Sequence, residues 1–116
     1  YNGSGWVYVG SPGFSKYMEK RGFSVVRDLV GHGVGLAVHE DPQIPHYVCN
    51  QYGEQDIVLK PGMVIAIEPM ISLGSPDITT GRDGFSFETI DGSWSAHFEH
   101  TIAITATGQQ ILTLPE

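Results

Sequence analysis

A glycine-rich stretch with two histidines contains the residue types that most clearly suggest chemistry. Residues 31–42 read GHGVGLAVHEDP, with glycine at positions 31, 33 and 35 and histidine at positions 32 and 39. Glycine at alternate positions of an extended segment removes every Cβ from one side, so another group can approach the backbone closely. Because histidine binds metals and exchanges protons near neutral pH, His32 and His39 are candidate functional residues. The alternative is a glycine-rich turn with two surface histidines.

Glu68 is a candidate because it is the lone carboxylate of an apolar run. Residues 63–71 read MVIAIEPMI and predict the strongest strand of the chain. Burying a bare carboxylate costs several kcal/mol, so we expect Glu68 to be paired, hydrogen-bonded or bound to a metal. The alternative is that Glu68 only marks the solvent-exposed end of the strand before Pro69.

Glu99 lies in a predicted strand over residues 95–104. Alternation along this strand defines two faces, one with His97, Glu99 and Thr101 and the other with Phe98, His100 and Ile102. With His32 and Glu68, Glu99 makes a mixed nitrogen and oxygen donor set, which suits Mn²⁺, Fe²⁺, Co²⁺ or Zn²⁺. A carboxylate between two ions can also bridge them. The three residues are too far apart in the sequence for spacing alone to bring them together.

The elements that must position these residues predict an α+β fold of mostly antiparallel strands with at least one helix. Residues 14–21 have helical spacing, and Gly22 is a plausible helix end. Besides 63–71 and 95–104, strands are predicted at 6–9, 23–26, 57–59, 85–89 and 111–114.

The predicted connections follow from glycine and proline. Residues 60–62 (KPG) predict a type II turn, and the pair 91–92 (DG) predicts a hairpin between 85–89 and the strand at 95–104. Residues 42–53 are expected to be irregular, because Pro42 and Pro45 would interrupt a strand ladder. Residues 73–84 are expected to form a polar connection.

Composition limits the classes of protein. A chain of 116 residues with 41% hydrophobic residues predicts one globular domain. A net charge of -7 argues against binding of nucleic acid, which needs a basic patch. The single cysteine, Cys49, favours a reducing compartment. Because no apolar stretch approaches bilayer length and the N-terminus lacks a signal pattern, we expect a cytoplasmic protein with no membrane partner.

Five motifs occur in the order typical of type I methionine aminopeptidases, namely 31–35 (GHGVG), 39–42 (HEDP), 59–63 (LKPGM), 67–70 (IEPM) and 98–101 (FEHT). The chain therefore resembles this family from about residue 17 to its C-terminus. The related prolidases share the first histidine motif, but their later motifs usually differ. The resemblance implies half of a two-metal "pita-bread" fold and removal of the initiator methionine, so the N-terminus of a peptide or nascent protein is the implied partner.

The resemblance also implies roles for single residues. His32 and Glu68 resemble ligands of one metal ion, and Glu99 resembles the carboxylate that bridges two. The implied cofactors are divalent ions (Co, Mn, Fe or Zn), two per complete site. His39 resembles the histidine that contacts the scissile peptide, while Phe85 and Val38 occupy positions that line the methionine pocket.

The sequence departs from the family pattern in two respects. The family site has two further aspartate ligands in the first half of its fold, and no aspartate here stands in a comparable motif. Residues 1–13 are expected to be an atypical leader or edge segment, and residues 14–116 the C-terminal half of the catalytic domain. We therefore expect the chain alone to be inactive or weak, with an exposed apolar face for a missing N-terminal half or a second copy. The alternative is a non-catalytic remnant that dimerises or binds another chain through this face.

Overall fold

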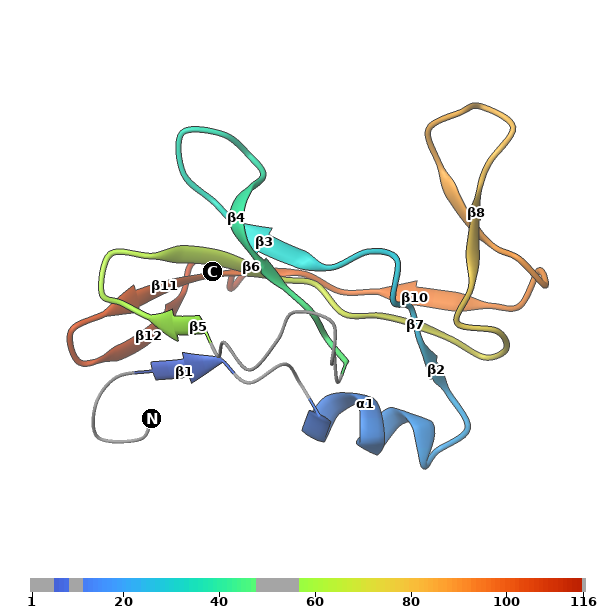
Figure 1. Cartoon of the computed structure of the whole chain (residues 1–116), viewed down its shortest axis with the longest axis horizontal. Helices are drawn as coiled ribbons and strands as arrows, with labels where there is room; N and C mark the ends of the chain where they lie inside the picture. Colours follow the sequence, from blue (N-terminus) through green and yellow to red (C-terminus); the bar gives the residue numbers. More distant parts are fainter. Residues whose placement is uncertain (1–5, 9–11, 48–56, 116) are drawn as a thin grey trace.

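A computed structural model of the chain describes residues 6–8, 12–47 and 57–115. In these residues it contains one helix and twelve strands in four sheets, and every strand pair is antiparallel. The molecule is elongated, with principal extents of 43 × 31 × 29 Å, and two sheets follow one another along its length (Figure 1). The expected α+β class, with mostly antiparallel strands, is confirmed.

The helix α1 (Pro12–Glu19) ends at a glycine, as the sequence predicts. Gly22 has a φ of 84°, in the left-handed region that glycine tolerates best. Its N–H donates to the carbonyl of Glu19 at 3.1 Å, and the next N–H, of Phe23, donates to Met18 at 3.1 Å. This pair of hydrogen bonds closes the helix C-terminus in a Schellman motif.

The five-stranded sheet holds the core. Its strands, from edge to edge, are β12 (Gly108–Ile111), β11 (His100–Thr105), β6 (Val64–Ile67), β3 (Gly31–Gly33) and β4 (Glu40–Ile44). Four buried residues form the core cluster, namely Ile44, Leu59, Ile65 and Ile104. The prediction of an irregular segment is wrong over 42–44, because these residues belong to β4, which includes Pro42. Proline is tolerated there because β4 is an edge strand. Residues 48–53 of that segment lie outside the described residues.

Three smaller sheets complete the described part. The strand order of one is β10 (Ser95–His97), β7 (Met70–Ser72) and β2 (Ser24–Val25). The two others are the pairs β1 (Trp6–Tyr8) with β5 (Ile57–Leu59) and β8 (Ile78–Thr80) with β9 (Phe87–Thr89).

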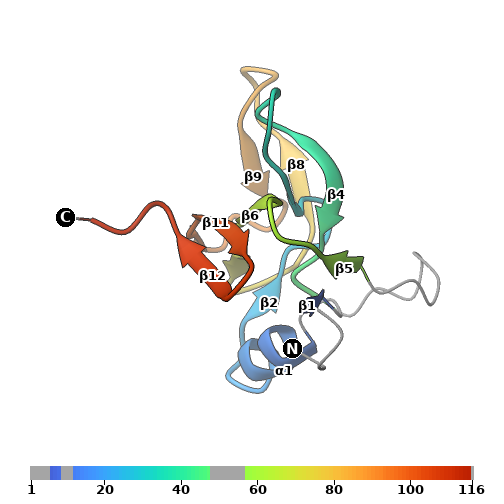
Figure 2. The same ribbon diagram turned by 90° about the vertical axis from the view of Figure 1, so that its left-hand side faces the viewer.

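The predicted hairpin at the 91–92 turn is wrong. Gly92 does make a turn, with a φ of 69° and its N–H on the carbonyl of Thr89 at 3.1 Å. However, β9 pairs with β8, and β10 pairs with β7. The predicted polar connection at 73–84 therefore contains the strand β8. The β8–β9 hairpin and the β3–β4 loop project from the molecule on the side opposite α1 (Figures 1 and 2).

The two longest predicted strands are each broken, and the breaks face one another. The run 63–71 divides into β6 and β7 at Glu68 and Pro69, and the run 95–104 divides into β10 and β11 at Phe98 and Glu99. Pro69 has no N–H to continue a ladder, but its carbonyl accepts the N–H of Phe98 at 3.4 Å. At this junction, the sheet crossing, both segments of the chain connect the three-stranded sheet with the five-stranded sheet. The two candidate glutamates, Glu68 and Glu99, therefore lie at the same place.

The alternate glycines serve close packing between strands. A Cβ at Gly31 would overlap the carbonyl oxygen of Ala66, and a Cβ at Gly33 would overlap that of Asp41. The bare side of the backbone therefore faces β6 and β4, which fixes His32 in the middle of the sheet. No helix of the described residues has the length and apolar character to span a bilayer.

Candidate metal centre

His32, Glu68 and Glu99 come together at the sheet crossing. Each offers one ligand atom, and these atoms all lie within 4.8 Å of one another. The side chains of His32 and Glu68 are each 13% exposed, while Glu99 is exposed. The three residues that the family resemblance implies as metal ligands therefore lie close together in the structure. Within the described residues, no aspartate belongs to this group.

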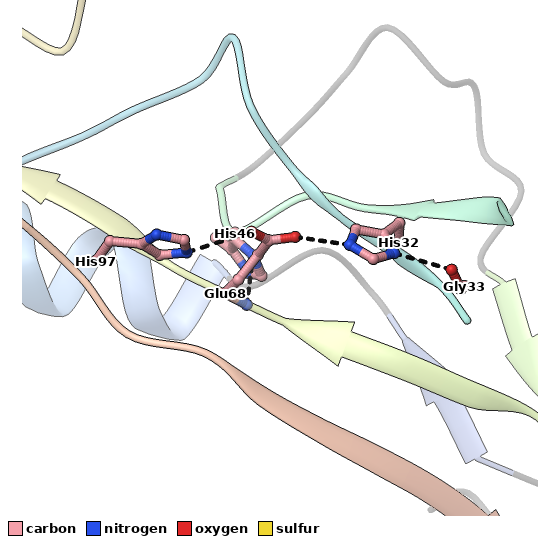
Figure 3. Close-up of polar contacts among 5 residues, drawn as sticks. All are labelled: His32, Gly33, His46, Glu68 and His97. Atoms are coloured by element: carbon pink, nitrogen blue, oxygen red, sulfur yellow. Dashed lines mark hydrogen bonds and ion pairs between the residues drawn. The ribbon is translucent and has the colours of Figure 1, made fainter. Parts of the chain in front are cut away.

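The hydrogen bonds of His32 leave one ring nitrogen for a cation. Its Nδ1 lies 2.9 Å from the carbonyl oxygen of Gly33, and since a carbonyl only accepts, Nδ1 carries the proton. Its Nε2 lies 3.1 Å from Oε1 of Glu68, as Figure 3 shows. In the neutral ring, this nitrogen and this oxygen are both electron-pair donors that face each other. A divalent ion would satisfy both, so the residues present fit a metal.

Two further histidines contact Glu68, and no motif in the sequence marks either of them as a site residue. Nε2 of His97 lies 3.2 Å from Oε2 of Glu68, and Nε2 of His46 accepts the backbone N–H of Glu68 at 3.1 Å (Figure 3). Alternation along the predicted strand at 95–104 places His97 on the same face as Glu99, and this shared face is a sequence signal that could identify His97 as a site residue. His46 follows a proline in a segment expected to be irregular, so no pattern pointed to it.

Burial keeps His46 in the form that its hydrogen bond requires. Its side chain is 3% exposed, and desolvation, with a smaller contribution from the nearby charge of His97, lowers the pKa of His46 to about 4. The ring is therefore neutral near pH 7, and its Nε2 can accept the N–H of Glu68.

His39 lies beside the three-residue group without belonging to it. Its ring centroid is 4.3 Å from that of His32, at an interplanar angle of 57°. Glu40 shapes the loop that carries it, because Oε1 of Glu40 accepts the N–H of Ala37 at 2.8 Å. His39 also lines a cleft of about 450 Å³, which His32, Glu68 and His97 line as well. The remaining walls of this cleft are mostly apolar, including Val30 and Met70.

Phe85 and Val38 do not line this cleft. Phe85 is 87% exposed on the turn between β8 and β9, and Val38 is 72% exposed in the β3–β4 loop. Neither is among the residues that line the cleft, although Phe87 of β9 is. The turn is held by Asp83, whose Oδ1 accepts the N–H groups of Phe85 and Ser86 at 2.9 and 2.8 Å. These hydrogen bonds lower the pKa of Asp83. The role of Phe85 and Val38 in a methionine pocket stays a prediction.

Curated relatives of this chain are methionine aminopeptidases. It is 58% identical over 97 residues to methionine aminopeptidase 1 of Bacillus subtilis, covering 84% of this chain and 38% of the relative. It is 50% identical over 99 residues to the methionine aminopeptidase of Escherichia coli strain K12, covering 85% of this chain and 36% of the relative. The chain thus spans less than two fifths of the length of these two proteins.

Solved structures show the same relationship. The methionine aminopeptidase of Thermotoga maritima superposes with a TM-score of 0.83 at 47% identity, covering 94% of this chain and 43% of that one. The prolidase of Pyrococcus furiosus gives a TM-score of 0.54 at 29% identity, covering 95% of this chain and 28% of that one. Because these neighbours have the pita-bread fold, the predicted half of that fold is confirmed.

The matched region includes each candidate ligand. The model of metallopeptidase family M24 matches residues 14–106, which contain His32, Glu68 and Glu99. The predicted resemblance to the methionine aminopeptidases is thereby confirmed, with five ordered motifs, a shared fold and a shared region of sequence in agreement. This chain belongs to metallopeptidase family M24.

Proposed function

We propose that this chain carries the metal-binding half of an aminopeptidase that removes the N-terminal methionine from newly made proteins. The observation that carries this proposal is the convergence of His32, Glu68 and Glu99 within 4.8 Å. The chain's relatives at 50–58% identity are methionine aminopeptidases. The donor set has the composition expected for such a metallopeptidase.

The proposed roles follow the family motifs. His32 and Glu68 would hold one divalent ion, and Glu99 would hold that ion together with a second, the ions being Co²⁺, Mn²⁺, Fe²⁺ or Zn²⁺. One imidazole with two carboxylates suits these ions and leaves coordination positions open. When bound, such ions activate water as a nucleophile and polarise the carbonyl that it attacks.

His39 is the proposed substrate contact. It lines the cleft beside the ligand group, and its ring packs against His32, which supports a contact between His39 and a peptide held at the metal centre. A histidine there donates a hydrogen bond to the peptide or to the developing tetrahedral intermediate. Phe85 and Val38 complete the proposed substrate site as walls of a methionine pocket.

We further propose that this half acts with additional residues. The relatives are more than twice as long as the matched segment, which covers 36–38% of them. Large apolar side chains here are exposed, among them Phe85 at 87%, Trp94 at 80% and Val38 at 72%. An N-terminal half would cover them and supply the two aspartate ligands, whereas a second copy of the chain would cover them without supplying those ligands. The chain alone is then a weak catalyst, and the working protein acts in the cytoplasm.

A chimaera tests the proposal. Residues 14–106 of this chain replace the matching segment of the Bacillus subtilis methionine aminopeptidase 1, and release of methionine from a Met-Gly peptide is measured with and without a chelator. We expect chelator-sensitive cleavage by the chimaera, loss of cleavage on Glu99→Gln, and little cleavage by the 116-residue chain alone.

The control is His100→Gln in the same chimaera, because His100 is not one of the three ligand residues. A folded chimaera that binds metal but releases no methionine would contradict the proposed activity. Rapid, chelator-sensitive cleavage by the chain alone would contradict the proposed dependence on further residues.

A further inference from the structure

We propose that His97 is a positioning residue that sets the orientation of the Glu68 carboxylate toward the metal. This inference rests on the proposed function, because it concerns a ligand of the proposed centre. His97 is outside the three-residue donor group, yet its Nε2 lies 3.2 Å from Oε2 of Glu68. It therefore acts on the centre through Glu68.

Glu68 needs such a restraint because of its place in the chain. It follows β6 at the point where the strand breaks before Pro69, so Glu68 itself is not part of a strand ladder. A glutamate side chain that is held in one rotamer loses conformational entropy. A ligand that is already held binds an ion more tightly than one that must first be ordered.

The two oxygens of Glu68 have separate partners (Figure 3). Oε1 faces Nε2 of His32 at 3.1 Å, where the proposed ion binds. Oε2 faces Nε2 of His97 at 3.2 Å, and because a carboxylate only accepts, His97 donates its Nε2–H. A neutral imidazole is sufficient for this hydrogen bond. His97 thereby occupies Oε2 and leaves Oε1 for the metal.

The backbone of His97 is anchored next to Glu68. His97 pairs with Met70 in the β10–β7 ladder, two residues beyond Glu68, and it precedes Glu99 by two residues. His46 holds the other end of the same glutamate by accepting its backbone N–H. The side chain of His97 is 48% exposed, so its removal leaves no buried cavity in the core.

The test compares two replacements of similar size in the full chain. His97→Gln keeps an N–H donor for Oε2 of Glu68, whereas His97→Leu removes it. Binding of Mn²⁺ is measured by the electron paramagnetic resonance signal of the free ion, and folding by circular dichroism. His100→Gln is the matched control, because it removes a neighbouring histidine that bonds Thr113. Loss of an outer hydrogen-bond partner typically costs roughly 10- to 100-fold in metal affinity.

We expect His97→Leu to weaken Mn²⁺ binding about tenfold or more, His97→Gln to restore most of it, and His100→Gln to leave it unchanged. Equal affinity of His97→Leu and the unmodified chain would overturn the inference, and so would equal losses in the Leu and Gln variants. Loss of the native circular dichroism spectrum in His97→Leu would also overturn it, because it would show a role in folding.

A second readout does not require metal. In the metal-free chain, the ¹⁵N resonances of the His97 ring should show a protonated Nε2 that changes on Glu68→Gln. Failure of the unmodified chain to bind Mn²⁺, with this NMR signature present, would overturn the proposed metal centre and leave the His97–Glu68 contact established. Binding of Mn²⁺ without the signature would overturn the inference about His97 alone.

Discussion

The imidazole rings of His32 and His39 pack against each other with their centroids 4.3 Å apart, although only His32 belongs to the donor group. His32 is fixed in the sheet between β4 and β6, whereas His39 is carried by the loop that returns to β4. Two histidines in contact are therefore held by different parts of the fold. This separation allows their roles to be tested independently.

We predict that His39→Ala lowers the catalytic rate, whereas His32→Ala lowers the metal content. In the chimaera described above, His39→Ala should lower kcat by roughly a hundredfold or more, because it removes a hydrogen bond to the transition state. Its metal content should stay nearly unchanged, whereas His32→Ala should lose metal. Metal analysis and steady-state kinetics measure both effects. If His39→Ala loses metal as readily as His32→Ala, the roles are wrong, and if it changes neither quantity, His39 is only a surface residue.

Metal should stabilise the fold. Glu68 and Glu99 bring two carboxylates close together, and an ion between them binds the folded state only. At about 100 times its dissociation constant, Mn²⁺ should add about 2.7 kcal/mol to the free energy of unfolding. The corresponding rise in Tm is roughly 10 °C or more for a chain of this size. Thermal unfolding with Mn²⁺ and with a chelator measures the difference, and a similar rise in Glu68→Gln would argue against this site.

Gly31→Ala should destabilise the five-stranded sheet. A Cβ at this position would overlap the backbone carbonyl of Ala66 and also press on Ile44. Since a backbone atom cannot move aside as a side chain can, we expect a loss of about 1–3 kcal/mol in the free energy of unfolding. The control is Gly13→Ala, where a Cβ meets nothing within 4 Å and the helix should gain up to about 1 kcal/mol. Urea unfolding compares the two, and equal stabilities would contradict the prediction.

Asp91 should make stability depend on pH at the acid end. Its carboxylate accepts the N–H of Ser75 at 2.7 Å and that of Ser93 at 3.0 Å. These hydrogen bonds, that of Ser75 first, lower the pKa of Asp91 from 3.8 to about 2. Because the folded-state pKa is the lower one, the stabilisation is fully present above pH 3.8 and is lost as the pH falls through about 2.

Urea unfolding of the unmodified chain and of Asp91→Asn at pH 5, 4 and 3 tests this dependence. The difference in unfolding free energy between the two proteins should narrow as the pH falls. A difference that stays constant over this range would show that the Asp91 hydrogen bonds do not contribute in the folded state.

Several local features follow from the sequence alone. Gly22 ends the helix because a left-handed residue closes it best. At residues 60–62, Gly62 has a φ of 97° and the N–H of Met63 donates to the carbonyl of Lys60 at 3.1 Å, as a type II turn requires. Phe98 and His100, predicted to share a face, have ring centroids 5.3 Å apart. Each depends on residues that are close neighbours in the chain.

The candidate ligands could also be named from the sequence, but through motifs and not through geometry. Glu68 stands out because a lone carboxylate in an apolar run needs a partner, and its proposed role as a ligand follows from the IEPM motif. No period or spacing connects His32 with Glu68 or Glu99, because 36 and 31 residues of chain separate them in turn (32 to 68 and 68 to 99). The ordered set of motifs supplied that connection.

Only the tertiary structure decided how the site is built. An apolar run predicts a continuous strand, and it cannot show that β6 and β7 belong to different sheets or that β10 and β11 divide at the same crossing. Only the tertiary structure shows that His46 and His97 belong to the site, because both contact Glu68 across the fold. Local pattern determines which residues prefer extended structure, whereas pairing between distant strands determines where each strand ends and which side chains meet.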